Sequence, residues 1–314
     1  MRKFAAIDLG SNAVRMAFAE LDKNGRLTIY KKFRIPLRLG SEAFEKGEFS
    51  EYTIKYASKA FEGFSHLIQS EKCDEVLAIA TSASRDVKNS SEFIKRVKEL
   101  SGIHIQIISG DKEAELIRKA VEWKVDLKGK NTLLMDIGGG SLELTVEAKG
   151  LPVGSKSFQL GTVRLLEKMK KGPDDFESLD KIIKANSSEM TQFLDKNLIG
   201  LESIRLIGTG GNFRRMLKLK RKIFESKDAD FITPEELEEI YLKLCQMPYL
   251  KRMKKFDLRP DRADVIIPAI RLTLQVIKGR DIKRILCPDV GLVHGLILAM
   301  GNGKIKEMRD HSST

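Results

Sequence analysis

The sequence lacks a long hydrophobic run, and no apolar stretch approaches the roughly 20 residues that a bilayer-spanning helix needs. The N-terminus reaches an acidic residue after only four apolar residues, so a secretory leader is not expected. The three cysteines are far apart, which favours structural thiols in a reducing compartment. The four histidines show no metal-ligand spacing, which argues against a zinc site. These shortages predict a cytoplasmic protein that is neither secreted nor membrane-spanning.

Length and charge indicate the number of domains and the kind of partner. A chain of 314 residues is typical of two domains of about 150 residues each. Hydrophobic residues make up 42% and charged residues 32%, as in folded globular proteins. The formal net charge of +12 favours an anionic partner, because such an excess attracts anions. Charge alone leaves nucleic acid, an acidic membrane and soluble polyphosphate open.

A strand, a glycine-containing turn and a second strand occur twice in the sequence. In the first copy, strands at 4–7 and 13–19 flank the turn; in the second copy, strands at 132–135 and 142–146 do so. Each first strand ends on an aspartate, and each copy leads into a third strand, at 27–33 or 153–160. This internal repeat predicts two related β-rich units.

Helical periodicity alternates with further strands along the chain. Apolar residues recur at helical spacing over 53–70, 91–100 and 176–194, and strands are expected at 76–80 and 104–108. The order indicates an α/β fold, and the polar stretch 125–131 indicates a domain boundary. We therefore predict two duplicated domains with a cleft between them, over residues 1–122 and 123–293. A C-terminal helix, at about 290–314, could pack back on the first domain.

Three glycine turns follow predicted buried strands. Glycine lets backbone N–H groups converge on a phosphate without a Cβ in the way, and Ser or Thr adds hydroxyl donors. A single turn of this kind would more often be an ordinary hairpin turn. Two of the three occupy repeated positions, which favours phosphate binding. The candidate phosphate-binding residues are Gly10, Ser11 and Asn12; Gly138, Gly139, Gly140 and Ser141; and Gly208, Thr209, Gly210 and Gly211.

Carboxylates lie next to two of these turns. Asp8 and Asp136 end their strands just before the glycines, where they could hold a divalent cation that bridges phosphate oxygens. Alternatively, each merely hydrogen-bonds its own turn. Glu143 lies two residues after Ser141, on the same face of the strand. Without the adjoining turn, a solvated strand residue would be the favoured interpretation. These three residues are the candidate metal ligands.

Taken in order, the motifs resemble the Ppx/GppA family of exopolyphosphatases and guanosine pentaphosphate phosphohydrolases. That family belongs to the superfamily of actin, the heat-shock chaperone ATPases and the sugar kinases. The resemblance implies two duplicated ribonuclease-H-like domains of the actin-like ATPase type. The matching segments are residues 7–12 with Arg15, residues 80–85, residues 108–110 followed by Glu113, residues 136–141 with Glu143, and residues 208–211.

The resemblance also implies roles for three further residues. Glu113 matches the family's catalytic glutamate, which orients and deprotonates the attacking water. From the residues alone, Glu113 could instead be a carboxylate that the dipole of its helix favours. Arg85 matches an arginine that contacts phosphate, and Arg15 is a similar candidate, although either could be an ordinary surface arginine.

The sequence departs from the family pattern at several positions. Lys112 stands where an acidic residue is common, and Leu142 stands where Thr is usual. Val293 and His294 replace the usual Arg-Glu pair, which puts one anion contact in doubt. The chain ends at residue 314, so the extra helical domains of the long family members are expected to be absent.

The expected activity is a Mg²⁺-dependent hydrolysis of the terminal phosphate of inorganic polyphosphate, with Mn²⁺ as a possible substitute. The alternatives are a guanosine pentaphosphate 5′-phosphohydrolase, a small-molecule kinase and a non-catalytic actin-like module. Expected partners are polyphosphate or guanosine penta- and tetraphosphate, without nucleic acid or membrane, and a homodimer is possible. Basic clusters at 31–38, 214–222 and 251–255 could guide polyphosphate or could be solvated helix faces.

Overall fold

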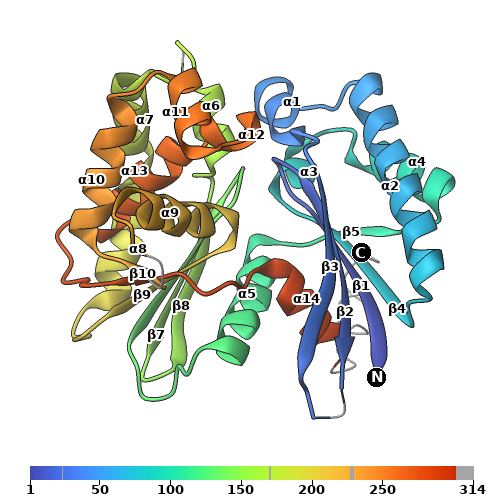
Figure 1. Cartoon of the computed structure of the whole chain (residues 1–314), viewed down its shortest axis with the longest axis horizontal. Coiled ribbons are helices and arrows are strands. Elements are labelled where there is room, and N and C mark those ends of the chain that lie inside the picture. Colours follow the sequence, from blue (N-terminus) through green and yellow to red (C-terminus); the bar gives the residue numbers. More distant parts are fainter. Residues whose placement is uncertain (23, 170, 227–229, 302–314) are drawn as a thin grey trace. The chain divides into compact units, whose positions relative to one another are not determined.

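The computed structural model describes residues 1–22, 24–169, 171–226 and 230–301 (Figure 1). The chain divides into two compact units. The first contains Met1–Ala120 together with helix α14 (Leu292–Gly301), and the second contains Val121–Gly291. Part of the predicted C-terminal helix, residues 302–314, lies outside the described residues.

The first unit contains a five-stranded sheet in the order β3-β2-β1-β4-β5. The first three strands form antiparallel hairpins, and β4 and β5 continue the sheet parallel to β1. Strands β1, β4 and β5 therefore end at the same edge of the sheet. The five strands are β1 (Arg2–Leu9), β2 (Val14–Leu21), β3 (Leu27–Ile35), β4 (Glu75–Ala80) and β5 (Ile105–Ile107).

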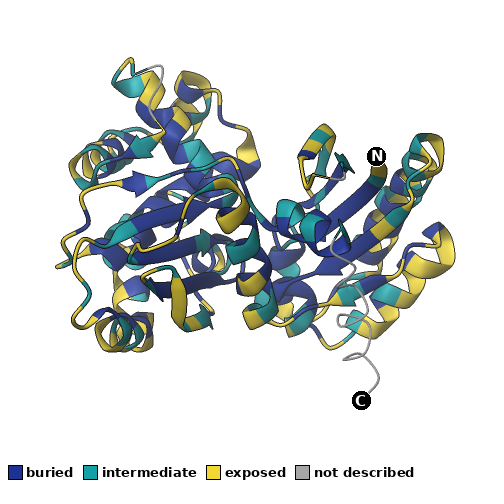
Figure 2. Cartoon of the chain, turned by 90° about the horizontal axis from the view of Figure 1, so that it is seen from below, coloured by how far each residue is buried: buried dark blue, intermediate teal, exposed yellow. Residues whose placement is uncertain are grey.

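Helices cover both faces of this sheet. One face packs on α2 and α4, whose apolar residues recur three and four positions apart, as in Ile54, Ala57, Phe61 and Phe64. The other face packs on α5 and α14. The strands are buried, whereas exposed residues gather on the outer sides of the helices (Figure 2). The helices are α1 (Leu39–Lys46), α2 (Glu51–Glu71), α3 (Ser82–Asp86), α4 (Ser90–Ser101) and α5 (Gly110–Lys124).

The second unit contains a six-stranded sheet in the order β10-β11-β9-β6-β7-β8. Three strands again form antiparallel hairpins, β9 runs parallel to β6, and β11 runs parallel to β9. The short β10 adds an antiparallel edge. The strands are β6 (Thr132–Ile137), β7 (Leu142–Ala148), β8 (Leu151–Phe158), β9 (Arg205–Thr209), β10 (Phe231–Ile232) and β11 (Ile285–Leu286).

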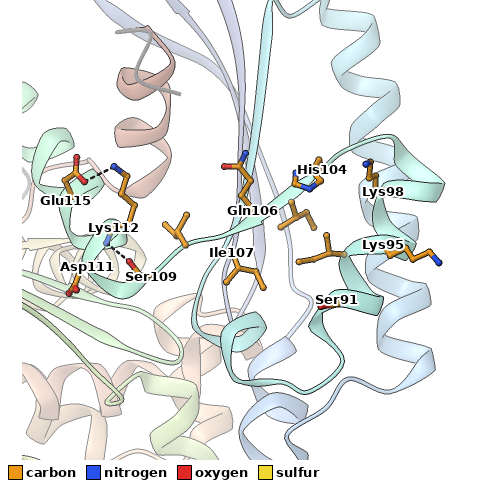
Figure 3. Close-up of a pocket in the computed structure, with 13 residues that line it drawn as sticks. Ser91, Lys95, Lys98, His104, Gln106, Ile107, Ser109, Asp111, Lys112 and Glu115 are labelled. Carbon is orange, nitrogen blue, oxygen red and sulfur yellow. Dashed lines mark hydrogen bonds and ion pairs between the residues drawn. The ribbon is translucent and has the colours of Figure 1, made fainter. Parts of the chain in front are cut away.

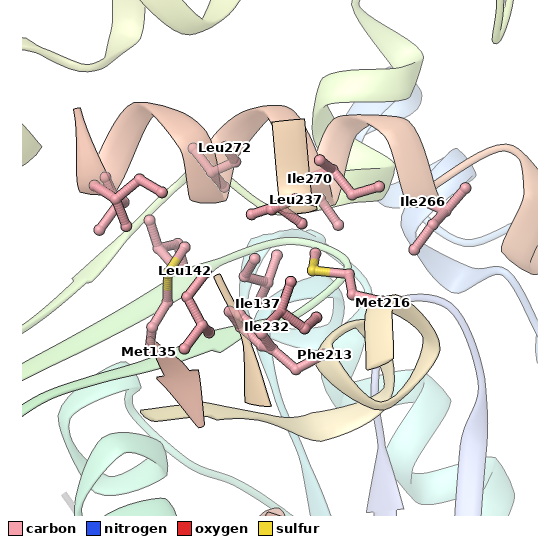
Figure 4. Close-up of a cluster of buried hydrophobic side chains, with 14 of the residues drawn as sticks. Met135, Ile137, Leu142, Phe213, Met216, Ile232, Leu237, Ile266, Ile270 and Leu272 are labelled. Carbon is pink, nitrogen blue, oxygen red and sulfur yellow. The ribbon is translucent and has the colours of Figure 1, made fainter. Parts of the chain in front are cut away.

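The core of the second unit lies on one face of its sheet. Met135, Ile137 and Leu142 point from β6 and β7 toward Phe213 of α9 and Ile270 of α13 (Figure 4). Because side chains alternate along a strand, Asp136 and Glu143 lie on the opposite face. The helices are α6 (Thr162–Glu167), α7 (Phe176–Asn186), α8 (Ser188–Leu198), α9 (Gly210–Ile223), α10 (Pro234–Cys245), α11 (Tyr249–Phe256), α12 (Pro260–Ala263) and α13 (Ile266–Ile277).

The two sheets share one topology. Each has three antiparallel strands followed by parallel strands on the far side of the first, so the central order 3-2-1-4-5 occurs in both. The predicted α/β fold with duplicated ribonuclease-H-like units is confirmed. The single helix predicted at 176–194 is wrong, because α7 ends at Asn186 and α8 begins at Ser188. At this break the side chains of Asn186 and Ser187 bond to backbone carbonyls of the preceding turn, which competes with helix continuation.

Candidate active site

The turn between β1 and β2 lies where β1, β4 and β5 end. The Gly10 N–H donates to the carbonyl of Ala13 at 3.2 Å, which closes a four-residue turn. The hydroxyls of Ser11 and Ser82 are 2.9 Å apart, and both residues are buried. This contact joins the turn to the segment that follows β4. A Cβ added to Gly10 would meet its nearest atom at 3.5 Å, so packing within the unit does not require glycine there.

Arg85 and Glu113 lie together at the same edge. Arg85 is on α3, and its guanidinium donates to the carbonyl of Ile108 at 2.6 Å. It also contacts the Glu113 carboxylate at 3.4 Å. Glu113 is in the first turn of α5, where Ser109 caps the helix by accepting from the Lys112 N–H at 3.2 Å. The predicted phosphate-binding arginine thus contacts the predicted base directly, a pairing that sequence reasoning missed.

Asp8 already has a cationic partner in the first unit. Arg15 is directly opposite Asp8 in the β1–β2 register, and its guanidinium donates to the carboxylate at 2.7 Å. The next residue in this row is Arg34 on β3, opposite Arg15. Two arginines therefore accompany a single buried carboxylate, which makes this sheet end more suitable for an anion than for a metal ion.

The turn between β6 and β7 repeats the first turn. The Gly138 N–H donates to the Ser141 carbonyl at 2.9 Å. The start of α6 bonds to the turn's carbonyls through the backbone N–H groups of Thr162, Val163 and Arg164. The Arg164 Nε atom also donates to the Gly140 carbonyl at 2.9 Å. Within the described residues, the N–H groups of Gly139 and Gly140 bond to no backbone carbonyl, so the turn can offer them to an anion.

A row of polar side chains crosses four strands just before this turn. Asp136 on β6 is directly opposite Glu143 on β7, which places their Cβ atoms about 5 Å apart. Thr209 on β9 lies beside Asp136 and donates to its Oδ1 at 2.5 Å. Ser157 on β8 lies beside Glu143 and donates to its Oε1 at 2.8 Å. The two hydroxyls orient a pair of neighbouring carboxylates.

The carboxylate pair fits a hard divalent cation. Oxygen ligands are those that Mg²⁺ prefers, and Mg²⁺ is usually held by one or two carboxylates together with substrate phosphates. No group of three or more His, Cys, Asp or Glu residues that could hold a metal occurs among the described residues. Asp136 and Glu143 are the neighbouring carboxylates of this row that could hold a cation. Asp8 is the poorer candidate because it pairs with Arg15.

In the third glycine turn, one glycine is required by packing and another by the adjoining carboxylate pair. Gly208 is inside β9, and any Cβ there would collide with the Phe213 ring, so packing alone explains this glycine. Gly210 has a φ of +81°, and a Cβ there would lie 2.6 Å from Asp136 Oδ1. Glycine is thus required beside the carboxylate pair. A phosphate contact at Gly208, Thr209, Gly210 and Gly211 stays a prediction.

Sequence reasoning missed Arg262, a buried arginine on the short helix α12. Its guanidinium nitrogens lie 3.1 and 3.3 Å from where a Cβ on Gly211 would be. The arginine therefore lies against the start of α9, beside the third glycine turn. Its sequence signal is the charged segment Arg259–Asp264 directly before the apolar helix α13, where buried charge is otherwise unexpected.

The residues that depart from the family pattern lie at the start of α5, in the core of the second unit and on α14. Lys112 is at the start of α5 and pairs with Glu115 at 2.8 Å. Leu142 is fully buried in the core on the face opposite Glu143, so its side chain lies away from the carboxylate pair. Val293 packs on the core that α5 and α14 share, and His294 follows it on α14.

The three cysteines are free thiols. Burial raises the pKa of Cys73 and Cys245, and it raises the pKa of Cys287 to about 12. Because the thiolate is the reactive form, these thiols are poorly reactive near neutral pH. This agrees with their interpretation as structural residues.

A cavity of about 1050 Å³ opens beside β5, between α4 and α5 (Figure 3). Lys95 and Lys98 line it from α4, His104 lines it from the segment before β5, and Lys112 lines it from α5. Its lining contains none of the predicted phosphate, metal or catalytic residues. The cavity is therefore separate from the candidate site, although it adjoins the helix that carries Glu113.

Two of the predicted basic clusters, at 214–222 and 251–255, contain buried or ion-paired residues. Lys220 is buried against Glu236 at 2.8 Å, and Arg252 is fully buried against Asp174 at 2.6 Å. Arg214 pairs with Asp289. Burial lowers the pKa of Arg215, and the nearby charge of Arg259 adds to the shift. Lys218 and the lysines of α11 stay exposed. Among the described helices, none is long and apolar enough to cross a membrane.

Known proteins resemble this chain in sequence and in fold. A model of the Ppx/GppA phosphatase family matches residues 20–302. The chain is 30% identical over 279 residues to a bifunctional 3-dehydroquinate synthase/phosphatase of Fusobacterium nucleatum, covering 84% of the chain but only 41% of that relative. It is 24% identical to a putative exopolyphosphatase of Haemophilus influenzae, covering 96% of the chain and 92% of the relative.

Two solved structures resemble the whole chain. An exopolyphosphatase from Cytophaga hutchinsonii is 23% identical, with a TM-score of 0.86, and the match covers 96% of this chain and 98% of that chain. A Ppx/GppA family member from Aquifex aeolicus is 25% identical, with a TM-score of 0.75 and the same coverage of 96% and 98%. The first likeness shows the fold alone.

Proposed function

Because the chain belongs to the Ppx/GppA phosphatase family, we propose that it hydrolyses the terminal phosphate of inorganic polyphosphate in a Mg²⁺-dependent reaction in the cytoplasm. The observation that carries this proposal is the pair of opposed carboxylates, Asp136 and Glu143, next to a glycine turn whose carbonyls are already bonded. That arrangement would supply ligands for a cation and N–H donors for a phosphate at one sheet edge.

The reaction would be an in-line attack of water on the terminal phosphorus, with the remaining phosphate chain as leaving group. Glu113 would accept the proton of the attacking water. Arg85 would hold Glu113 in place and contact a phosphate oxygen with the same guanidinium, since a planar fork offers several donors. Most of the rate enhancement would come from positioning and charge neutralisation.

The two glycine turns would bind phosphates through their N–H groups and hydroxyls. Asp136 and Glu143 would hold Mg²⁺, or Mn²⁺ in its place, and the cation would neutralise phosphate charge. Asp8 would contribute at most through a water molecule, because Arg15 occupies its carboxylate.

The decisive experiment measures phosphate release from polyphosphate with Mg²⁺ and no acceptor. Glu113→Gln should lower kcat by about 10²–10⁴-fold, the usual contribution of a general base, with little change in KM. The matched control is Glu115→Gln on the same helix, which removes a carboxylate that pairs with Lys112 and Lys119. Near-normal turnover of Glu113→Gln would contradict the assignment. A strict need for an acceptor would indicate a kinase instead.

Metal removal tests the second part of the proposal. Activity should be lost in EDTA and should return with Mg²⁺ or Mn²⁺, because two neighbouring carboxylates favour a hard cation. The cation should also be measurable by titration of the protein in the absence of substrate. Full activity in the chelator would exclude the metal from the mechanism.

Substrate choice is tested by chain length and salt. If exposed cations such as Lys218 guide a long polyanion, KM should fall with chain length. That advantage should shrink steeply as salt rises, because phosphate contacts release counterions. Lys218→Glu should raise KM for long polyphosphate only, whereas Lys220, being buried, is unsuitable for this test. A higher kcat/KM for guanosine pentaphosphate, with no dependence on chain length, would assign the nucleotide as the substrate.

A further inference from the structure

Helix α14 lies beside helix α5 within the first unit (Figure 1). The backbone of Leu116 on α5 is the nearest neighbour of Gly295 on α14. A Cβ added to Gly295 would lie far closer than 3.0 Å to the carbonyl oxygen of Leu116, and 2.7 Å from its carbonyl carbon. Real Cβ atoms essentially never approach other atoms within 3.0 Å. The atoms in the way are helix backbone, so they cannot rotate aside. Gly295 is therefore the residue that permits this close contact.

The contact is enclosed by a common core. Leu116 and Ile117 of α5, and Leu296 and Ile297 of α14, belong to one buried cluster on a single face of the first sheet. Phe4 is part of the same cluster and is fully buried. Because such a core is close-packed, extra volume at the contact must displace a helix.

Glu113 lies on α5 one helical turn before Leu116. The start of α5 is held by the Ser109 cap and by a bond from the Glu113 N–H to the Ser109 carbonyl at 3.0 Å. At 3.4 Å from Arg85, the Glu113 carboxylate is near the limit of a hydrogen bond, so a small shift of α5 would break this contact. A shift of about 1 Å can cost about 10²-fold in rate when it misplaces a reacting group.

We propose that Gly295 is a positioning residue for Glu113: it sets the depth at which α5 packs, and thereby the place of the Glu113 carboxylate. This inference rests on the proposed role of Glu113 as the base. Gly295 lies far along the sequence from every candidate site residue of the first unit.

The test is a double-mutant cycle with Gly295→Ala and Glu113→Gln, measured as kcat on polyphosphate with Mg²⁺. Gly295→Ala should lower kcat by about 10²-fold and leave KM nearly unchanged. In the Glu113→Gln background, Gly295→Ala should lower kcat only slightly further, because the base that it misplaces is already absent. The full chain is used throughout, and thermal melting checks that each variant is folded.

The matched control is Gly301→Ala on the same helix. A Cβ at Gly301 would also overlap a neighbour, but that neighbour is the end of the Leu21 side chain, which can rotate away. This variant should keep wild-type kcat. A second variant, Leu116→Val, removes one methylene at the contact from the α5 side and is put through the same cycle if Gly295→Ala does not fold.

Two results would overturn the inference. Normal kcat in folded Gly295→Ala would show that α5 does not depend on the contact. Equal fold losses from Gly295→Ala with and without Glu113→Gln would show that the loss arises elsewhere. If Glu113→Gln alone keeps normal turnover, the base assignment itself is wrong and the positioning role is rejected with it, a failure seen in the single variant before any cycle is built.

Discussion

The two units use the same sheet positions for opposite charges. Next to the turn of the first unit, the row across the strands reads Arg34, Arg15, Asp8 and Ile79. At the equivalent register positions of the second unit, it reads Ser157, Glu143, Asp136 and Thr209. The central aspartate is common to both rows. Its neighbour is an arginine in one and a glutamate in the other.

This exchange of side chains favours different ligands in the two units. In the first unit the aspartate is neutralised at 2.7 Å by Arg15, so a metal ion would meet repulsion there. In the second unit two carboxylates adjoin, and a bound cation would relieve their mutual repulsion. We therefore assign anion contact and proton transfer to the first unit, and cation binding to the second, as parts of the proposed function.

Among the changes that test this contrast between the units, breaking the carboxylate pair has the largest expected effect. Glu143→Gln should lower kcat by about 10²–10³-fold, since charge stabilisation by a metal is worth several kcal/mol and each 1.36 kcal/mol is tenfold. It should also raise the Mg²⁺ concentration needed for half activity. The counterpart, Arg15→Gln, should change KM for polyphosphate and leave the Mg²⁺ requirement unaltered. A normal Mg²⁺ titration of Glu143→Gln would remove the contrast between the units.

A smaller effect should follow from the hydroxyls at the ends of the second row. Thr209→Val and Ser157→Ala each remove a donor that orients one carboxylate, so Mg²⁺ affinity should fall about 10- to 100-fold. Ile79 occupies the position of Thr209 in the first unit, and Ile79→Val should leave Mg²⁺ affinity unchanged. Calorimetric titration of each variant with Mg²⁺ measures this, and equal affinities in all three would contradict the orienting role.

The smallest effect concerns the glycines. Gly210→Ala forces a left-handed backbone on alanine, at a cost of about 1–2 kcal/mol, and it also crowds Asp136. Gly10→Ala should change the free energy of unfolding by less than about 0.5 kcal/mol, because its nearest neighbour is 3.5 Å away. Denaturant unfolding measures both. A raised KM in stable Gly10→Ala would indicate that a phosphate approaches this turn closely.

Much of the fold could be predicted from the sequence. The hairpin repeat was visible because each turn is bounded by apolar strands and contains glycine, and the helices at 53–70 and 91–100 have clear apolar stripes. The break after Asn186 was missed because the apolar spacing continues across it, and only the competing polar side chains interrupt the helix.

The candidate site was predictable residue by residue but not pair by pair. The sequence predicts Asp136 and Glu143 as metal ligands beside one turn, whereas their direct opposition across two strands depends on the four-residue turn that sets the register. The Arg85–Glu113 contact joins α3 and α5, and Arg262 approaches Gly211 from α12. The charged segment around Arg262 could mark that residue, but no local pattern identifies the partner in either contact. Long-range packing of this kind becomes visible only when the chain is folded.

The bonding of α6 to the glycine turn of the second unit has a consequence for the thermodynamics of binding. Three successive glycines would ordinarily be the loosest part of a chain, with the most conformational entropy to lose when a ligand orders them. Here the backbone N–H groups of Thr162, Val163 and Arg164 fix the turn as part of folding. The entropy cost of ordering the turn is therefore part of the free energy of folding. An anion that enters the turn would meet donors that are already in place.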